Sequence, residues 1–159
     1  LHAIDTIRFL ADSDVKQILA IVRRTTSSYR DVHAALVEFE NGVVAQLTHN
    51  YTTGARLERY EIHGHDISAY MEGIYGGKLF FEDEESEIVK GPTGGTEEQD
   101  RYFIDCVKND KEPLVTGEDA RAGLEGIYAA YESAGTGRKV ELPFRPPGVE
   151  KPIDLWLRK

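Results

Sequence analysis

The stretch VHAALVEFENGVVAQLTHNY, residues 32–51, decides the fold. Two runs rich in β-branched and aromatic residues, 32–40 and 43–51, flank the dipeptide Asn41-Gly42. Asn-Gly is the preferred two-residue type I′ turn, because both positions tolerate a positive φ. The sequence therefore predicts an antiparallel hairpin.

A two-residue turn also fixes the register of this hairpin. It would place Val37 opposite Gln46, Ala34 opposite His49 and His33 opposite Asn50. Both faces of the pair would then be partly apolar, whereas a sheet with one face in water alternates more cleanly. We expect the second face to be covered as well, by helices of the same chain or by another subunit.

Helices and further strands extend outward from the hairpin. Apolar residues three apart, from Leu1 to Leu10, predict an amphipathic helix over residues 1–11. Further strands are expected at residues 15–24, 57–63, 67–73, 78–81, 86–89 and 140–142. The acidic run at residues 82–85 is interpreted as a solvated loop.

Two more helices follow these strands. The first opens at a capping box, Thr96 to Gln99, and runs to about Asn109, with Tyr102, Phe103, Cys106 and Val107 on its inner face. The second opens at residues 116–119 and ends at Gly135 or Gly137. Its inner face is predicted to hold Ala120, Leu124, Ile127, Tyr128 and Tyr131.

This order of elements is typical of an α+β fold. We expect one open, mostly antiparallel sheet with helices packed on one face and the other face available for oligomerisation. Residues 1–142 would form the domain, and residues 143–159 an extended tail from which Leu155, Trp156 and Leu157 can dock.

Composition excludes several classes of partner. The net charge of −9 disfavours binding to nucleic acid, which repels an acidic surface. No apolar run reaches the roughly 18 residues that span a bilayer. The one cysteine, Cys106, cannot form an internal disulfide and fits a buried, inert thiol in a reducing cytoplasm.

Histidines offer little support for a metal site. The predicted register puts His33 and His49 on opposite faces of the hairpin, so the two would not share a metal ion. His63 and His65 flank a glycine, but two ligands without a third make a weak site. We therefore predict no metal. The sequence also has no Gly-x-Gly-x-x-Gly turn, so no cofactor-binding residue is predicted.

His2 and Asp5 are the candidate catalytic pair. They lie three apart on the first helix, where a histidine can exchange a proton with a substrate hydroxyl and an acidic neighbour can orient its ring. The alternative reading is an ordinary histidine in the first turn beside a surface carboxylate.

Four segments in order resemble the C-terminal domain of the glucose–fructose oxidoreductase and inositol dehydrogenase family, Gfo/Idh/MocA. Residues 1–10 resemble the family's His-x-x-Asp helix, and Asn41-Gly42 its hairpin. Residues 61–67 look like its Glu-x-x-Gly turn, and residues 115–138 like its closing helix. The resemblance runs from Leu1 to about Leu142.

The resemblance implies a larger enzyme. An N-terminal Rossmann domain, absent from this chain, would bind NAD or NADP, and the substrate would be a sugar, cyclitol or related polyol. His2 would be the acid/base residue. Asp5 is a further candidate substrate residue, and Tyr51, Arg56 and Arg59 would either bind a polyol or stabilise the edge of the sheet. The family also uses the open sheet face for subunit contacts, so a homo-oligomer is expected.

The chain by itself is then expected to be inactive. The alternative hypothesis is a non-catalytic dimerisation or ligand-sensing module that uses the same sheet.

Overall fold

The structure is a computed structural model that describes residues 1–55, 57–73, 76–81, 84–90, 95–146, 148 and 151–157; at 84–90 and 157 it describes the backbone alone. The chain forms two compact units, one of Leu1–Thr52 with Leu114–Lys159, the other of Thr53–Pro113.

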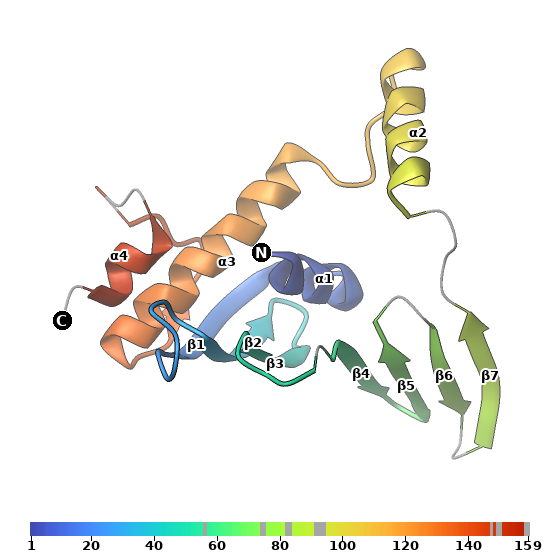
Figure 1. The fold of residues 1–159 in the computed structure, drawn as a ribbon. Helices are drawn as coiled ribbons and strands as arrows, with labels where there is room; N and C mark the ends of the chain where they lie inside the picture. Colours follow the sequence, from blue (N-terminus) through green and yellow to red (C-terminus); the bar gives the residue numbers. More distant parts are fainter. Residues whose placement is uncertain are drawn as a thin grey trace. The chain divides into compact units, whose positions relative to one another are not determined.

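The first unit is a four-stranded sheet with helices on one side (Figure 1). Its antiparallel strands lie in the order β3-β2-β1-β8. Its elements are α1 (His2–Ala11), β1 (Val15–Arg23), β2 (Val32–Phe39), β3 (Val44–Asn50), α3 (Gly117–Thr136), β8 (Val140–Glu141) and α4 (Pro152–Leu157).

The second unit is an antiparallel sheet with strands in the order β4-β5-β6-β7, followed by a helix. Its elements are β4 (Arg59–Gly64), β5 (Ile67–Glu72), β6 (Gly76–Phe81), β7 (Glu84–Lys90) and α2 (Gly95–Lys108). The predicted turn before β5 is confirmed, with Asp66 at a φ of 57°. Residues 82 and 83 of the acidic run lie outside the described residues.

The α+β class is confirmed, but the single predicted sheet is two sheets of four strands. The chain turns sharply where β3 ends. The Asn50 carboxamide oxygen accepts hydrogen bonds at 2.9 Å from both the backbone N–H and the hydroxyl of Thr52. This local turn ends the ladder, and the next strand begins only at Arg59.

The hairpin between β2 and β3 is confirmed, but its predicted register is wrong by one residue. The Phe39 N–H donates to the Val43 carbonyl at 2.9 Å, and the Gly42 N–H donates to the Phe39 carbonyl at 3.0 Å. The loop therefore has three residues and ends with Gly42 at a φ of 88°. Asn41 instead uses its side chain, which donates to the Ala11 carbonyl at 2.8 Å.

The shift in register reassigns the faces of β3. Val37 lies opposite Ala45, not Gln46, and Ala35 lies opposite Leu47. A slip of one residue moves every side chain of a strand to the other face. Ala45 and Leu47 therefore pack against the core that contains Val37 and Phe39.

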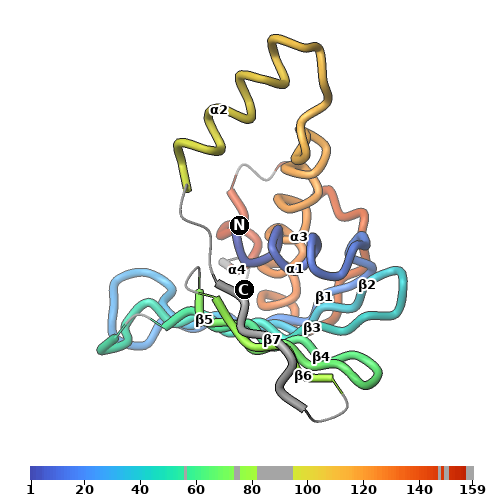
Figure 2. The backbone as a smooth tube through the Cα atoms, turned by 90° about the vertical axis from the view of Figure 1, so that its right-hand side faces the viewer, coloured from blue at the N-terminus to red at the C-terminus, as the bar shows by residue number. Residues whose placement is uncertain are grey.

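The core lies between the first sheet and its helices. Ile18, Val37 and Phe39 are completely buried there, together with Ile4 and Ala129 from the helices. Figures 1 and 2 show α1 and α3 on the same side of the sheet. The helices thus cover one face of the sheet and bury its apolar side chains, as predicted.

The inner face of α3 is made of small residues, which corrects the predicted face. Its buried residues are Gly123, Gly126, Ala129, Ser133 and Ala134, whereas Leu124 is exposed. A Cβ at Gly126 would lie 3.0 Å from Ile4 Cγ2 of α1, and one at Gly135 would lie 2.6 Å from the Leu155 carbonyl oxygen of α4. Small residues are required because other elements approach the α3 backbone closely.

The predicted caps of α3 are confirmed. The Thr116 hydroxyl accepts from the Asp119 N–H at 3.3 Å, and the Asp119 carboxylate accepts from the Thr116 N–H at 2.9 Å. Gly137 ends the helix with a φ of 70°. The capping box predicted for α2 is not placed as expected, because the helix begins at Gly95 and Thr96 lies inside it.

Two predicted docking faces differ in outcome. On α2 only Cys106 is buried, while Phe103 and Val107 are more than half exposed, so the predicted inner face is wrong for these two residues. The tail is not extended throughout: it contains α4, and Leu155 is buried against α3, which confirms that this residue docks.

No helix in the described part of the chain has the length and apolar character needed to cross a membrane.

Ser133 completes the hydrogen bonding of β1. The short strand β8 pairs only with Gln17 and Ile18, and the Ala20 N–H beyond it donates to the Ser133 hydroxyl at 2.8 Å. Ser133 is fully buried, so water does not reach this bond. The hydroxyl therefore takes the place of a strand partner.

Replacing Ser133 by Ala will leave the Ala20 N–H buried without an acceptor. We expect the free energy of unfolding to fall by about 1–3 kcal/mol, measured by urea denaturation. Thr136→Ala is the control, because both hydrogen bonds of the Thr136 hydroxyl are exposed: it donates to the Glu132 carbonyl and accepts from the Arg138 N–H. Equal losses in the two variants would contradict the role of Ser133.

Candidate functional site

His2 lies in the first turn of α1, and its side chain is exposed. Asp5, which was expected to orient the ring of His2, interacts with Arg8. The Asp5 carboxylate lies 4.0 Å from the Arg8 guanidinium, one turn further along the same helix. Leu1 is the N-cap, and its side chain makes no capping bond. Because its side chain is exposed, His2 is accessible from solvent.

Arg8 fixes the helix that carries His2. Its guanidinium lies 2.8 Å from the Asp14 carboxylate and 3.6 Å from that of Asp119 at the start of α3. It also donates to the Asp119 carbonyl at 3.3 Å. Hydrogen bonds from Thr116, and then the charge of Arg8, hold the pKa of Asp119 below its ordinary value. No local sequence pattern indicates this network, because Arg8, Asp14 and Asp119 come from different segments of the chain.

A second group of polar aromatic side chains lies on the face of the sheet that the helices cover. We call His33, His49, Tyr51 and Tyr131 the His–Tyr cluster. The ring of Tyr51 packs edge-on against His33 at 5.9 Å and His49 at 5.4 Å. The Nε2 atom of His33 lies 3.3 Å from the Tyr131 hydroxyl.

The prediction that His33 and His49 lie on opposite faces is wrong. They are direct partners across β2 and β3, because the three-residue loop shifts the register by one. Tyr51 was predicted as a substrate residue and belongs to this cluster. Tyr131 was predicted to face inward and is half-buried.

Burial and neighbouring charges shift the pKa values of two residues in the His–Tyr cluster, His33 and Tyr131. Burial lowers the pKa of His33 first, and the neighbouring His49 lowers it further, while Asp31 opposes the shift. Burial likewise raises the pKa of Tyr131. Both side chains therefore favour their neutral forms.

Asp31 orders the loop beside the cluster. Its fully buried carboxylate accepts hydrogen bonds from the backbone N–H groups of Thr25 at 2.8 Å and Thr26 at 3.1 Å, and from the Thr25 hydroxyl at 2.7 Å. These bonds hold the pKa of Asp31 far below its ordinary value. The run of hydroxyl residues before Asp31 was the available sequence signal for this loop.

The remaining predicted substrate residues lie elsewhere. Arg59 belongs to the second unit, on β4, and pairs with Glu72 across the sheet at 3.2 Å. Arg56 lies outside the described residues.

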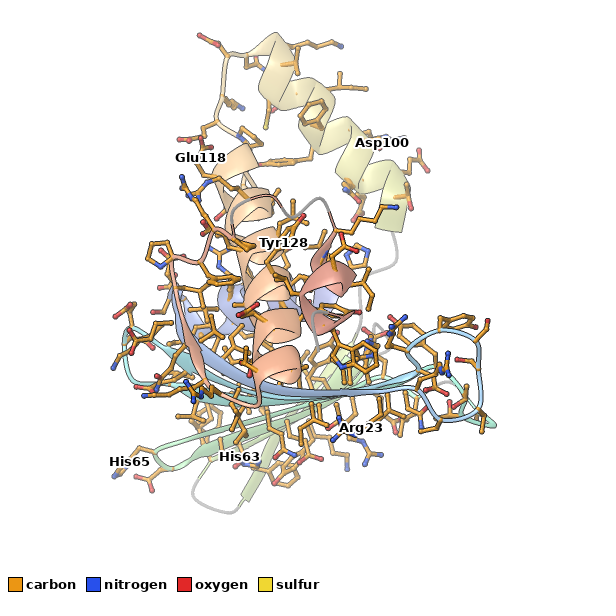
Figure 3. All side chains as sticks on the ribbon, turned by 90° about the vertical axis from the view of Figure 1, so that its left-hand side faces the viewer. Arg23, His63, His65, Asp100, Glu118 and Tyr128 are labelled. Atoms are coloured by element: carbon orange, nitrogen blue, oxygen red, sulfur yellow. The ribbon has the colours of Figure 1, made fainter. Side chains whose placement is uncertain are left out.

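Metal ligands do not gather in the part of the chain that the structure describes, where no group of three suitable side chains occurs. The ring of His63 lies 3.2 Å from the Ser68 hydroxyl, and His65 lies 2.5 Å from the Asp66 carboxylate. Figure 3 shows these two histidines.

The described residues do not contain the parallel strand, glycine turn and helix that form a Rossmann-type dinucleotide site. Dinucleotide cofactors bind where a parallel β-strand turns through glycines into a helix. All strand pairs of both sheets are antiparallel.

A shallow groove of about 600 Å³ lies between the end of α3 and β8. It is lined by residues such as Glu132, Lys139 and Phe144, and it contains neither His2 nor the His–Tyr cluster.

The lowered pKa of His33 makes stability depend on pH. The unfolded chain binds a proton near the ordinary pKa of about 6.5, whereas the folded chain resists protonation. This contribution to stability will therefore be complete above pH about 6.5, will fall as the pH drops from there towards the lowered pKa, and will level off below it. His33→Phe will flatten this slope in urea titrations across the window. His65→Gln, whose side chain is 94% exposed, will keep it; an unchanged slope in His33→Phe would refute the assignment.

The chain is similar in sequence to known proteins. The chain is 26% identical over 151 residues to 1,5-anhydro-D-fructose reductase of Ensifer adhaerens, covering 89% of this chain and 45% of that protein. It is 28% identical to scyllo-inositol 2-dehydrogenase (NAD(+)) of Bacillus subtilis, covering 91% of this chain and 46% of that protein. The chain thus spans about half the length of these relatives.

The fold recurs in solved structures. Aldose-aldose oxidoreductase from Caulobacter crescentus, solved with glycerol, superposes with a TM-score of 0.78 at 20% identity. The match covers 89% of this chain and 45% of that one. Residues 1–70 match the model of the GFO/IDH/MocA C-terminal domain. The resemblance predicted from the sequence is confirmed, since residues 1–70 are similar to the GFO/IDH/MocA C-terminal domain.

Proposed function

We propose that this chain is the substrate-side and oligomerisation domain of an NAD(P)-dependent oxidoreductase. Its substrate would be a sugar, cyclitol or related polyol with a reacting hydroxyl or carbonyl group. The supporting observation is the accessible His2 on a helix held in place by Arg8. The relatives named above act on such compounds according to their names.

In this proposal His2 exchanges a proton with the reacting oxygen. Its imidazole accepts the hydroxyl proton when the substrate is oxidised and returns it when a carbonyl is reduced. Arg8 is a positioning residue, because it holds α1 against Asp14 and the start of α3. Asp5 lies on the same helix and binds substrate in the proposal.

Tyr51 is well placed to contact a polyol. Its side chain is 62% exposed, and its ring lies beside His33 and His49. A ring with one polar end both packs against a sugar and hydrogen-bonds to it. Arg56 and Arg59 follow Tyr51 in the sequence and are proposed as further substrate contacts.

The cofactor, NAD or NADP, would bind to the part of the relatives' length that this chain does not span. The chain by itself would then be inactive. A cytoplasmic location agrees with Cys106, a buried free thiol.

His2→Asn tests the proton transfer in the intact protein that carries this chain. Asparagine keeps a polar side chain but does not exchange a proton, so kcat should fall by about 100-fold or more, with KM little changed. His65→Asn is the control, because that exposed histidine lies in the second unit. Normal turnover in His2→Asn would eliminate the proposed role. Absence of turnover in the wild type as well as in both variants would favour the non-catalytic module.

The open face of the first sheet supports self-association. This face lies opposite α3 and exposes several large apolar side chains. The exposed residues are Leu19 at 43%, Ile21 at 53%, Leu36 at 51% and Val44 at 69%. They occupy adjacent strands, since Leu19 pairs with Leu36 across β1 and β2. A contiguous apolar patch of this kind marks an interaction surface.

Leu36→Glu should dissociate the proposed homo-oligomer, because it places a charge at the centre of this patch. Light scattering of the intact protein would show the change in mass, with circular dichroism confirming the fold. Val115→Glu is the matched control, since Val115 is 56% exposed but lies in the segment before α3. A monomeric wild type would contradict oligomerisation through this face.

A further inference from the structure

Three buried nitrogens without hydrogen-bond partners belong to one neighbourhood of the first unit. Among the described residues, Arg30 Nε, His33 Nδ1 and Trp156 Nε1 are buried and unpaired. The Arg30 guanidinium lies 4.3 Å from the centre of the Trp156 ring. We call Arg30, His33, Tyr131 and Trp156 the donor cluster.

Tyr131 links the two sides of the donor cluster. Its hydroxyl lies 3.3 Å from His33 Nε2, and the charge of Arg30 acts on it, lowering its pKa against the effect of burial. Loop, strand and helices thus bring these four side chains together: Arg30 precedes β2, His33 is on β2, Tyr131 on α3 and Trp156 on α4.

Two donors of the cluster, Arg30 Nε and Trp156 Nε1, lack acceptors, whereas His33 Nε2 and the Tyr131 hydroxyl bond to each other. The arginine and tryptophan nitrogens only donate hydrogen bonds, and a buried donor without an acceptor is unfavourable. The neighbouring carboxylate, Asp31, is already occupied, because its two oxygens accept from Thr25 and Thr26. A group rich in acceptor oxygens would complete the hydrogen bonding.

We propose that the donor cluster binds an anionic oxygen group, a carboxylate or a phosphate, carried by a sugar-sized molecule. Arg30 supplies the positive charge and a charged donor. The exposed rings of His49 and Tyr51 adjoin His33 and contact the rest of the molecule. The sugar part of this ligand rests on the proposed function, whereas recognition of the anion does not.

The fluorescence of Trp156 tests the proposal, because it is the one tryptophan of the 159-residue chain. The chain is titrated with glucuronate, glucose 6-phosphate and glucose at constant ionic strength. We expect a saturable change with at least one anion and none with glucose. A preference for glucuronate identifies a carboxylate site, and a preference for glucose 6-phosphate identifies a phosphate site.

Arg30→Gln should weaken binding of the preferred anion by about 10- to 100-fold, the loss expected for a charged hydrogen bond. Arg23→Gln is the matched control: Arg23 is exposed and lies on the side of the first sheet away from α3 (Figure 3). Should Arg30→Gln fail to fold by circular dichroism, Tyr131→Phe replaces it, with an expected loss of about fivefold.

The proposal is overturned if neither anion gives a saturable change, if glucose binds equally well, or if Arg30→Gln and Arg23→Gln lose the same affinity. Turnover in the intact protein is a separate readout. Oxidation of neutral polyols without anion binding would refute this site and leave the proposed function standing. Anion binding without any turnover would do the reverse.

Discussion

Close packing against the small-residue face of α3 is the constraint on which the first unit depends. Gly123 and Gly126 allow α1 to approach, since a Cβ at Gly126 would lie 3.0 Å from Ile4. Gly135 allows the backbone of α4 to do the same on the other end of the helix. Ser133 adds a directional bond to β1. Larger side chains on this face would separate the layers, because interiors are packed without space to spare.

The same packing determines where the polar groups meet. α3 presents Asp119 at its start to Arg8, which fixes the helix bearing His2, and presents Tyr131 further along to His33. α4, docked on Gly135, brings Trp156 over Arg30. One helix thus connects the proposed proton-exchanging residue with the proposed anion site, so substitutions on its inner face would disturb both.

Much of the fold follows from local sequence patterns. The three-residue apolar spacing predicted α1, Thr116 and Asp119 predicted the start of α3, and β-prone runs predicted β1 to β7. Patterns of this kind failed where tertiary contacts compete with local preference. Asn41-Gly42 favours a two-residue turn, but Asn41 binds the end of α1, and the loop becomes three residues long. The predicted inner face of α3 was wrong for Leu124 because apolar spacing does not reveal a need for small residues.

The sequence by itself determined the α+β class, the position of nearly every element, the likeness to a known domain family and His2 as a candidate. These properties depend on residues near one another in the chain. Only the tertiary structure decided that His33 faces His49, that Tyr131 joins them and that Arg30 lies over Trp156. The reason is physical: a shift of one residue in a hairpin reverses a face, and contacts between distant segments depend on how closely helices pack.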